Sequence, residues 1–218
     1  YTPMRYAWAM ESDYLRDFGL ARGPLAWLAR RELAKLRAWD RAAAQRVTDI
    51  VAISRYVAGR IRNAYGRDAP VIYPPVDVEA FAPGGAREDF YVVVGRLVPY
   101  KRADAVVEAF RRLPERRLVV IGEGPLRPAL ERDLPPNVRL LGHAPHEVVL
   151  DHLRRARAFV FAGEEDFGIA PVEALACGTP VIALGRGGLL ETVVDGETGV
   201  FFPEPTPVAI AQAVGRFE

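Results

Sequence analysis

From residue 90 onward, short apolar runs alternate with amphipathic segments. The runs are rich in β-branched and aromatic residues, which is typical of strands covered on both faces. We predict strands at residues 90–94, 117–121, 138–141, 159–161, 180–184 and 200–202. Between and after them, apolar residues recur every three or four positions, which predicts helices at 101–113, 126–134, 147–156, 170–177, 189–194 and 207–218. This alternation predicts an α/β fold with a doubly wound parallel sheet.

A long amphipathic helix is predicted to follow Gly23-Pro24. Its expected core-facing stripe is Leu25, Leu28, Leu33, Leu36, Trp39, Ala43 and Val47. Much of the remaining surface is basic, with Arg30, Arg31, Lys35, Arg37 and Arg41. One interpretation is a helix packed on a sheet with a solvated basic face. The other is a helix that lies on an anionic membrane through Trp27 and Trp39.

The pattern changes again between this helix and residue 90. We expect a strand at 49–54, a helix at 56–65 that Gly66 ends, and a further strand at 70–73. Pro74-Pro75 and Pro83-Gly84-Gly85 then interrupt regular structure. The sequence therefore predicts a first domain at 1–73, a linker at 74–89 and a second domain at 90–218.

Composition says more about the cellular compartment of the protein than about its function. The 218 residues carry a net charge of +1, so overall charge identifies no partner and gives no indication of nucleic-acid binding. The single cysteine, Cys177, permits no disulfide within the chain, and its apolar surroundings predict a buried thiol. The apolar runs are too short to cross a bilayer, and no signal-peptide pattern opens the sequence. We expect a cytoplasmic protein, with peripheral contact at the inner membrane face as an option.

Candidate chemistry lies in the loops that follow the predicted strands, where parallel sheets bind their ligands. In the first of these loops, Gly95 permits a tight turn, and Arg96 and Lys101 bring two cations to the strand end. Two such cations suit a diphosphate. The alternative is a pair of solvated surface charges.

The next two loops give weaker signals. Gly122-Glu123-Gly124-Pro125 is glycine-rich but lacks the third glycine of the dinucleotide fingerprint, so a plain turn is the favoured interpretation of this loop alone. The loop at 142–146 contains His143 and His146. No matched cysteine or aspartate ligands lie at metal-ligand spacing from these two histidines and His152, so we predict no metal site.

The loop after strand 159–161 carries the strongest single signal. Glu165 and Glu173 lie eight residues apart on either side of a predicted helix start. A helix N-terminus attracts anions, and the two carboxylates suit hydrogen bonds from sugar and ribose hydroxyls. Spacing alone equally allows two exposed acids balanced by basic residues. Gly185-Arg186-Gly187-Gly188 offers backbone amides and one arginine at the next helix start.

Taken together, these motifs resemble a known family. They comprise Gly-Arg-Leu with a lysine five residues after the arginine, Gly-Glu-Gly-Pro, Glu-Asp-Phe-Gly-Ile with a second glutamate eight residues on, Ala-Cys-Gly-Thr-Pro-Val-Ile-Ala, Gly-Gly-Leu-Leu-Glu-Thr-Val and Asp-Gly-Glu-Thr-Gly. The combination resembles glycosyltransferase family 4, the retaining GT-B enzymes that use nucleotide sugars. Residues 54–202 carry the resemblance. The opening Thr-Pro-Met-Arg-Tyr-Ala-Trp is similar to bacterial mannosyltransferases that build surface polysaccharides.

The resemblance implies a Rossmann-like GT-B C-terminal domain, preceded by a partial N-terminal domain, and a role for each candidate. Arg96 and Lys101 would hold the donor diphosphate and stabilise the leaving group, Glu165 would contact the donor sugar, and Glu173 would bind the ribose. The remaining donor-binding candidates are Gly95, Gly122 and Glu123 beside the base and phosphates, and Phe167, Gly168 and Ile169 facing the sugar and phosphate. The donor would be a GDP- or UDP-linked hexose, the acceptor a glycan or a lipid-linked glycan, and no metal would be needed.

The chain also departs from the family pattern. Most of the first domain is missing, Tyr1 stands where the family has a histidine, and the final helix stops at Glu218. We therefore expect a donor-binding fragment of a hexosyltransferase. The alternatives are a non-catalytic nucleotide-sugar-binding module, a subunit whose missing half is another chain, a strand-exchanged dimer, and a sugar phosphorylase that depends on phosphate.

Overall fold

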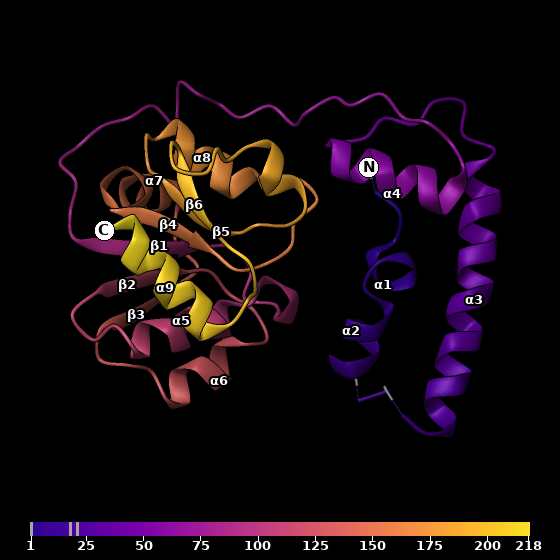
Figure 1. Cartoon of the computed structure of the whole chain (residues 1–218), viewed down its shortest axis with the longest axis horizontal. Coiled ribbons are helices and arrows are strands. Elements are labelled where there is room, and N and C mark those ends of the chain that lie inside the picture. Colours follow the sequence, from indigo (N-terminus) through magenta and orange to yellow (C-terminus); the bar gives the residue numbers. More distant parts are fainter. Residues whose placement is uncertain (1, 18, 21) are drawn as a thin grey trace. The chain divides into compact units, whose positions relative to one another are not determined.

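The chain forms two compact units, Tyr1–Pro74 and Pro75–Glu218, shown in Figure 1. The structure is a computed structural model, and it describes residues 2–17, 19–20 and 22–218.

The second unit, all of which is described, is built around a six-stranded parallel sheet. Its strands are β1 (Phe90–Val94), β2 (Arg117–Ile121), β3 (Val138–Gly142), β4 (Ala158–Phe161), β5 (Val181–Leu184) and β6 (Gly199–Phe202). Their order across the sheet is β3-β2-β1-β4-β5-β6. The predicted doubly wound sheet is confirmed, and its order reverses between β1 and β4, where such sheets bind ligands.

Helices cover both faces of this sheet, as Figure 1 shows. They are α5 (Ala103–Arg111), α6 (Arg127–Arg132), α7 (His146–Arg155), α8 (Ile169–Ala176) and α9 (Pro207–Phe217). Strand residues alternate between two cores, so Tyr91 joins Phe110 of α5 on one face, and Phe90 joins Leu153 of α7 on the other. This double burial explains why the strands are continuous apolar runs.

Two predicted helices differ from the observed ones. The helix expected at 101–113 starts later, because Pro99–Lys101 forms a short 3-10 turn and Arg102 has a left-handed φ of 55°. The helix expected at 189–194 is wrong: only a 3-10 turn forms, at Gly188–Glu191. Three consecutive β-branched residues, Thr192 to Val194, disfavour a helix there.

Residues 75–89, where the sequence predicts a linker, contain no helix or strand but are tied to the second unit. The Arg154 guanidinium donates hydrogen bonds to the carbonyls of Ala80 (3.0 Å) and Ala82 (2.9 Å). Arg87 donates to the Ala156 carbonyl at 2.7 Å, and Phe81 is buried. These contacts make the segment a strap on the second unit.

The described part of the first unit is mainly helical. Its helices are α1 (Arg5–Trp8), α2 (Glu11–Asp17), α3 (Pro24–Ala44) and α4 (Arg55–Tyr65). The predicted helix at 56–65 is confirmed: the Ser54 hydroxyl accepts a hydrogen bond from Val57 N at its start, and Gly66 ends it with a left-handed φ of 68°.

The strands predicted at 49–54 and 70–73 are wrong. These segments meet only at a parallel bridge, in which Ala52 N donates to Pro70 O and Ile72 N donates to Ala52 O, both at 2.9 Å. Pro70 has no amide hydrogen to extend the ladder. No further strand among the described residues pairs with the bridge, and two short strands alone are marginal.

The core-facing stripe predicted for α3 is also wrong in part. Leu25, Leu28, Trp39 and Val47 are exposed, and α3 packs against α1 and α4 instead of a sheet. The reason is a polar anchor on the inward face: the Asp40 carboxylate accepts hydrogen bonds from Trp8 Nε1 (2.8 Å) and Tyr65 Oη (2.7 Å). No helix in the described chain is long and apolar enough to cross a membrane.

Candidate functional site

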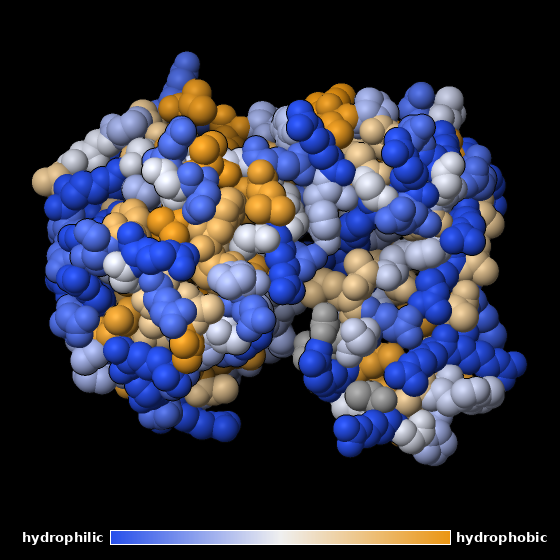
Figure 2. Space-filling view, in the orientation of Figure 1, coloured by the Kyte–Doolittle hydropathy of each residue, from blue (hydrophilic) through white to orange (hydrophobic). Residues whose placement is uncertain are grey.

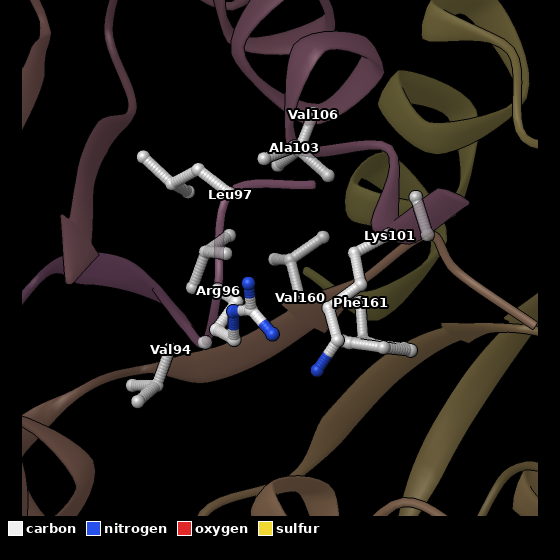
Figure 3. A pocket seen from close by; sticks show the side chains of 11 residues that line it. Val94, Arg96, Leu97, Lys101, Ala103, Val106, Val160 and Phe161 are labelled. Atoms are coloured by element: carbon white, nitrogen blue, oxygen red, sulfur yellow. The ribbon is translucent and has the colours of Figure 1, made fainter. Parts of the chain in front are cut away.

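The site is centred on the point where β1 and β4 run side by side and the sheet order reverses. The loops that follow these two strands bring Arg96 and Lys101 together with Glu165. Figure 3 shows Arg96 and Lys101 beside the apolar side chains of Val160 and Phe161, around a small cavity. Its volume of about 10 Å³ holds about one water, so any larger ligand must lie over the open edge of the sheet.

The two cations at this point, Lys101 and Arg96, differ in their contacts with the rest of the protein. Lys101 Nζ lies 3.1 Å from Glu165 Oε1, with the two side chains only 24% and 17% exposed. The same ammonium lies 5.8 Å from the centroid of the Phe161 ring. Arg96 is exposed, and no described residue forms a hydrogen bond or ion pair with its side chain. One cation is therefore neutralised in place, and a second is available to an anionic ligand.

Close backbone approaches hold the loops together at this edge. Gly122, with a φ of 148°, lies so near the loop after β1 that a Cβ atom would sit 1.9 Å from Gly95 O. Gly187, with a φ of 69°, lies against the loop after β4, where a Cβ atom would sit 2.4 Å from Glu165 O. Only glycine permits both contacts. The structure thus brings the predicted residues Gly95, Gly122 and Glu165 to one edge.

Helix α8 begins at the same edge. Gly168 precedes it with a left-handed φ of 88°, and no side chain caps its first amides. Ile169, the first helical residue, is exposed, whereas the Phe167 side chain is buried. The backbone amides at Gly168 and Ile169 are therefore the groups that an anion can reach.

The second predicted carboxylate, Glu173, is half-buried in α8. Burial raises the pKa of Glu173, and the nearby His146 opposes that shift. His146 opens α7 and packs edge-on against Phe81, with ring centroids 5.3 Å apart. The sequence places His146 in a loop far along the chain from Glu173, and only the packing of α7 on α8 brings the two residues near each other.

Hydrogen bonds hold the Glu123 side chain in place. Its carboxylate accepts hydrogen bonds from the Arg127 guanidinium and from the backbone amide of His143, the latter at 3.2 Å. Arg127 Nε also donates to Glu131 at 2.6 Å. Glu123 therefore ties the loop after β2 to the loop after β3.

Two other residues singled out in the sequence have surroundings of their own. Arg186 donates to the carbonyl of Pro203 at 3.3 Å. Cys177 is a buried free thiol, as predicted, and burial raises its pKa. Across the described residues, no group of three or more His, Cys, Asp and Glu side chains is placed to hold a metal ion.

Comparison with known proteins identifies relatives for most of the second unit. Residues 79–218 match the family described as "Glycosyl transferases group 1". A GDP-mannose-dependent alpha-(1-6)-phosphatidylinositol monomannoside mannosyltransferase of Mycolicibacterium smegmatis is 33% identical over 194 residues, covering 75% of this chain and 51% of the relative. A D-inositol 3-phosphate glycosyltransferase of Kribbella flavida is 36% identical over 163 residues, covering 61% and 38%. The chain spans about half the length, or less, of these relatives.

Solved structures support the same fold. Anabaena Alr3699/HepE in complex with UDP-glucose matches with a TM-score of 0.72 at 22% identity, covering 83% of this chain and 57% of that one. The sucrose-phosphate synthase of Thermosynechococcus elongatus matches with a TM-score of 0.74 at 24% identity, covering 83% and 51%. These likenesses confirm the predicted Rossmann-like GT-B architecture.

Proposed function

The chain belongs to the glycosyl transferases group 1 family, and we propose that its second unit binds the nucleotide-sugar donor of a retaining hexosyl transfer. In this proposal a hexose, with mannose as the candidate, passes from a GDP- or UDP-linked donor to a polysaccharide or lipid-linked acceptor. A cytoplasmic location belongs to the same proposal. The observation that carries it is the meeting of Arg96, Lys101 and Glu165 at the crossover of the sheet.

The diphosphate is the part of the donor that these charges suit best. Arg96 has no protein partner among the described residues, so its guanidinium is available for paired hydrogen bonds to phosphate oxygens. The free amides at the start of α8 face the same edge. As the glycosidic bond breaks, negative charge grows on the leaving diphosphate, and fixed positive groups stabilise that charge. Arg96 and Lys101 would supply this stabilisation without a metal ion.

The carboxylates divide the remaining recognition between them. Glu165 lies beside the Lys101 ammonium, where it would accept hydrogen bonds from donor-sugar hydroxyls. Glu173 lies farther along α8 and would accept hydrogen bonds from the ribose. The loops that Glu123 joins would lie by the base. This order follows the donor from sugar through phosphate to nucleoside.

Calorimetric titration with GDP and UDP in the presence of EDTA tests the donor site. The wild-type chain should release or absorb heat with at least one nucleotide, and chelation should leave the affinity unchanged. R96E/K101E should weaken binding by about a hundredfold or more, because two charge-assisted contacts become repulsive. R112E/R132E, which makes the same charge change at two exposed arginines, should bind like wild type. No heat with either nucleotide at millimolar concentration would overturn the proposal.

A second candidate is a binding module without chemistry, either alone or as one subunit of a larger assembly. It is favoured by the location of every proposed site residue in the second unit. Donor hydrolysis separates the two candidates. Release of free hexose from GDP-mannose or UDP-glucose that E165Q abolishes supports the enzyme, whereas tight binding with no release supports the module.

A further inference from the structure

Helix α3 of the first unit presents large apolar side chains to solvent. Trp27 is 65% exposed and Trp39 is 61% exposed, and Leu28 lies on the same outward side. Figure 2 shows strongly hydrophilic residues interleaved with more hydrophobic ones over this helix. An exposed apolar patch that polar residues border is typical of an interaction surface.

Hydrogen bonds on the opposite side fix the direction of this face. The inward-facing Asp40 accepts bonds from Trp8 and Tyr65. Arg37 Nη1 donates to the Ala7 carbonyl at 2.9 Å, and Arg41 Nε donates to the Ala64 carbonyl at 2.8 Å. A rotation that buried Trp27 and Trp39 would break these bonds. The outward direction of the tryptophans is therefore built into the packing of the unit.

The outward face also carries an excess of positive charge. The Lys35 side chain is 60% exposed, and the Arg31 guanidinium lies 5.7 Å from the centroid of the Trp27 ring. The acid that meets these cations among the described residues is Glu32, 2.7 Å from Lys35. Cations and indole rings thus lie side by side along the helix.

We infer that the outward face of α3 docks on an anionic lipid bilayer. Tryptophan favours the boundary between headgroups and acyl chains, where its ring is buried and its N–H stays hydrated. Lysine and arginine beside it extend their charged ends to anionic headgroups. Twenty-one residues at 1.5 Å each give α3 a length of about 30 Å along the surface. A purely apolar partner would leave the cations unpaired, and a soluble anion would leave the tryptophans exposed.

Intrinsic fluorescence reports on this surface directly, because all three tryptophans of the chain lie in the first unit. With vesicles of 30% phosphatidylglycerol in phosphatidylcholine, emission should shift to the blue and brominated acyl chains should quench it. Vesicles of pure phosphatidylcholine should produce neither effect. Raising the salt concentration should reverse the association. The readout needs no donor or acceptor, so its outcome is separate from that of the proposed function.

Paired variants identify the groups responsible. R31E/K35E should lower the partition coefficient for the anionic vesicles about thirtyfold or more, at about 1 kcal/mol for each charge removed. R112E/R132E should leave it unchanged, and W27S/W39S should abolish the blue shift although the cations remain. Far-UV circular dichroism confirms folding of each variant.

Three results with vesicles would overturn the inference. They are no association with anionic vesicles, equal association with pure phosphatidylcholine, and unchanged association of R31E/K35E. Tryptophan emission that is already blue-shifted and shielded from iodide without vesicles would also overturn it, because protein would then cover this face.

Discussion

The two units of this chain use apolar residues in different ways. In the second unit, Phe110 and Phe159 are fully buried on opposite faces of one sheet, and helices cover both sides. In the first unit, the helix with the most large apolar residues exposes two tryptophans, and the buried cluster is the small group around Val57 and Ile61. An apolar pattern therefore predicts burial only where a second surface exists to receive it.

Truncation of a large aromatic residue should show the largest difference in stability effect between the two units. Phe159→Ala removes a fully buried ring from β4 and should lower the free energy of unfolding by about 3–5 kcal/mol. Trp39→Ala removes a larger but exposed side chain and should change the free energy of unfolding by about 0.5 kcal/mol or less. Urea unfolding followed by circular dichroism measures both. A cost for Trp39→Ala near that for Phe159→Ala would mean that α3 is covered.

Glycine substitutions test the convergence of loops in the second unit. Gly122→Ala places a Cβ atom 1.9 Å from a backbone oxygen in a strained conformation, so we expect about 2–4 kcal/mol of destabilisation. Gly215→Ala in α9 meets no atom within 4 Å and should stabilise the chain by about 0.5–1 kcal/mol. Thermal unfolding gives both values. Equal effects would show that the loops after β1 and β2 are not in contact.

The polar anchor of the first unit should have a smaller but measurable effect. Asp40→Ala leaves the Trp8 and Tyr65 donors without their acceptor and should cost about 1–3 kcal/mol. Asp68→Ala removes an exposed carboxylate that pairs with Arg62 and should cost about 0.5 kcal/mol or less. Hydrogen exchange of α3 and α4 amides localises the loss. Faster exchange confined to the second unit would contradict this assignment.

The smallest expected effect is a pH dependence from Glu173. Burial raises the pKa of Glu173 in the folded state, so ionisation at higher pH destabilises the fold. Glu173→Gln should therefore raise the unfolding midpoint relative to wild type at pH 7.5. The difference should disappear as the pH falls below the unfolded pKa of a glutamate. A difference that grew on acidification would mean that the ionised carboxylate is stabilising.

The local pattern of apolar residues and their burial agree in the sheet of the second unit. The strands of the second unit were predictable because runs such as Phe90–Val94 are apolar at every position, which only a doubly covered strand requires. The 3-10 turn at Gly188–Glu191 was not predicted, since Leu189 and Val193 keep a helical spacing although the β-branched residues end the helix. For α3 the pattern failed because the inward-facing group is the polar Asp40.

At the candidate site, the residue types were predictable from the sequence, whereas the contacts between them were not. The residue types at Arg96, Lys101 and Glu165 indicated phosphate and sugar chemistry. The ion pair between Lys101 and Glu165 was not predictable, because it depends on β4 lying next to β1. The local sequence does not determine the order of strands in the sheet. The proximity of His146 to Glu173 depends in the same way on how α7 packs on α8.

Hydrogen exchange measured with and without GDP and with and without UDP tests the central claim most directly. The account predicts slower exchange, for at least one nucleotide, in peptides covering residues 95–101 and 163–170 of the second unit. Peptides of α3 should exchange at the same rate in both states. Unchanged exchange at 95–101 and 163–170 with either nucleotide at saturation, or protection confined to the first unit, would contradict the placement of the diphosphate at the β1–β4 crossover.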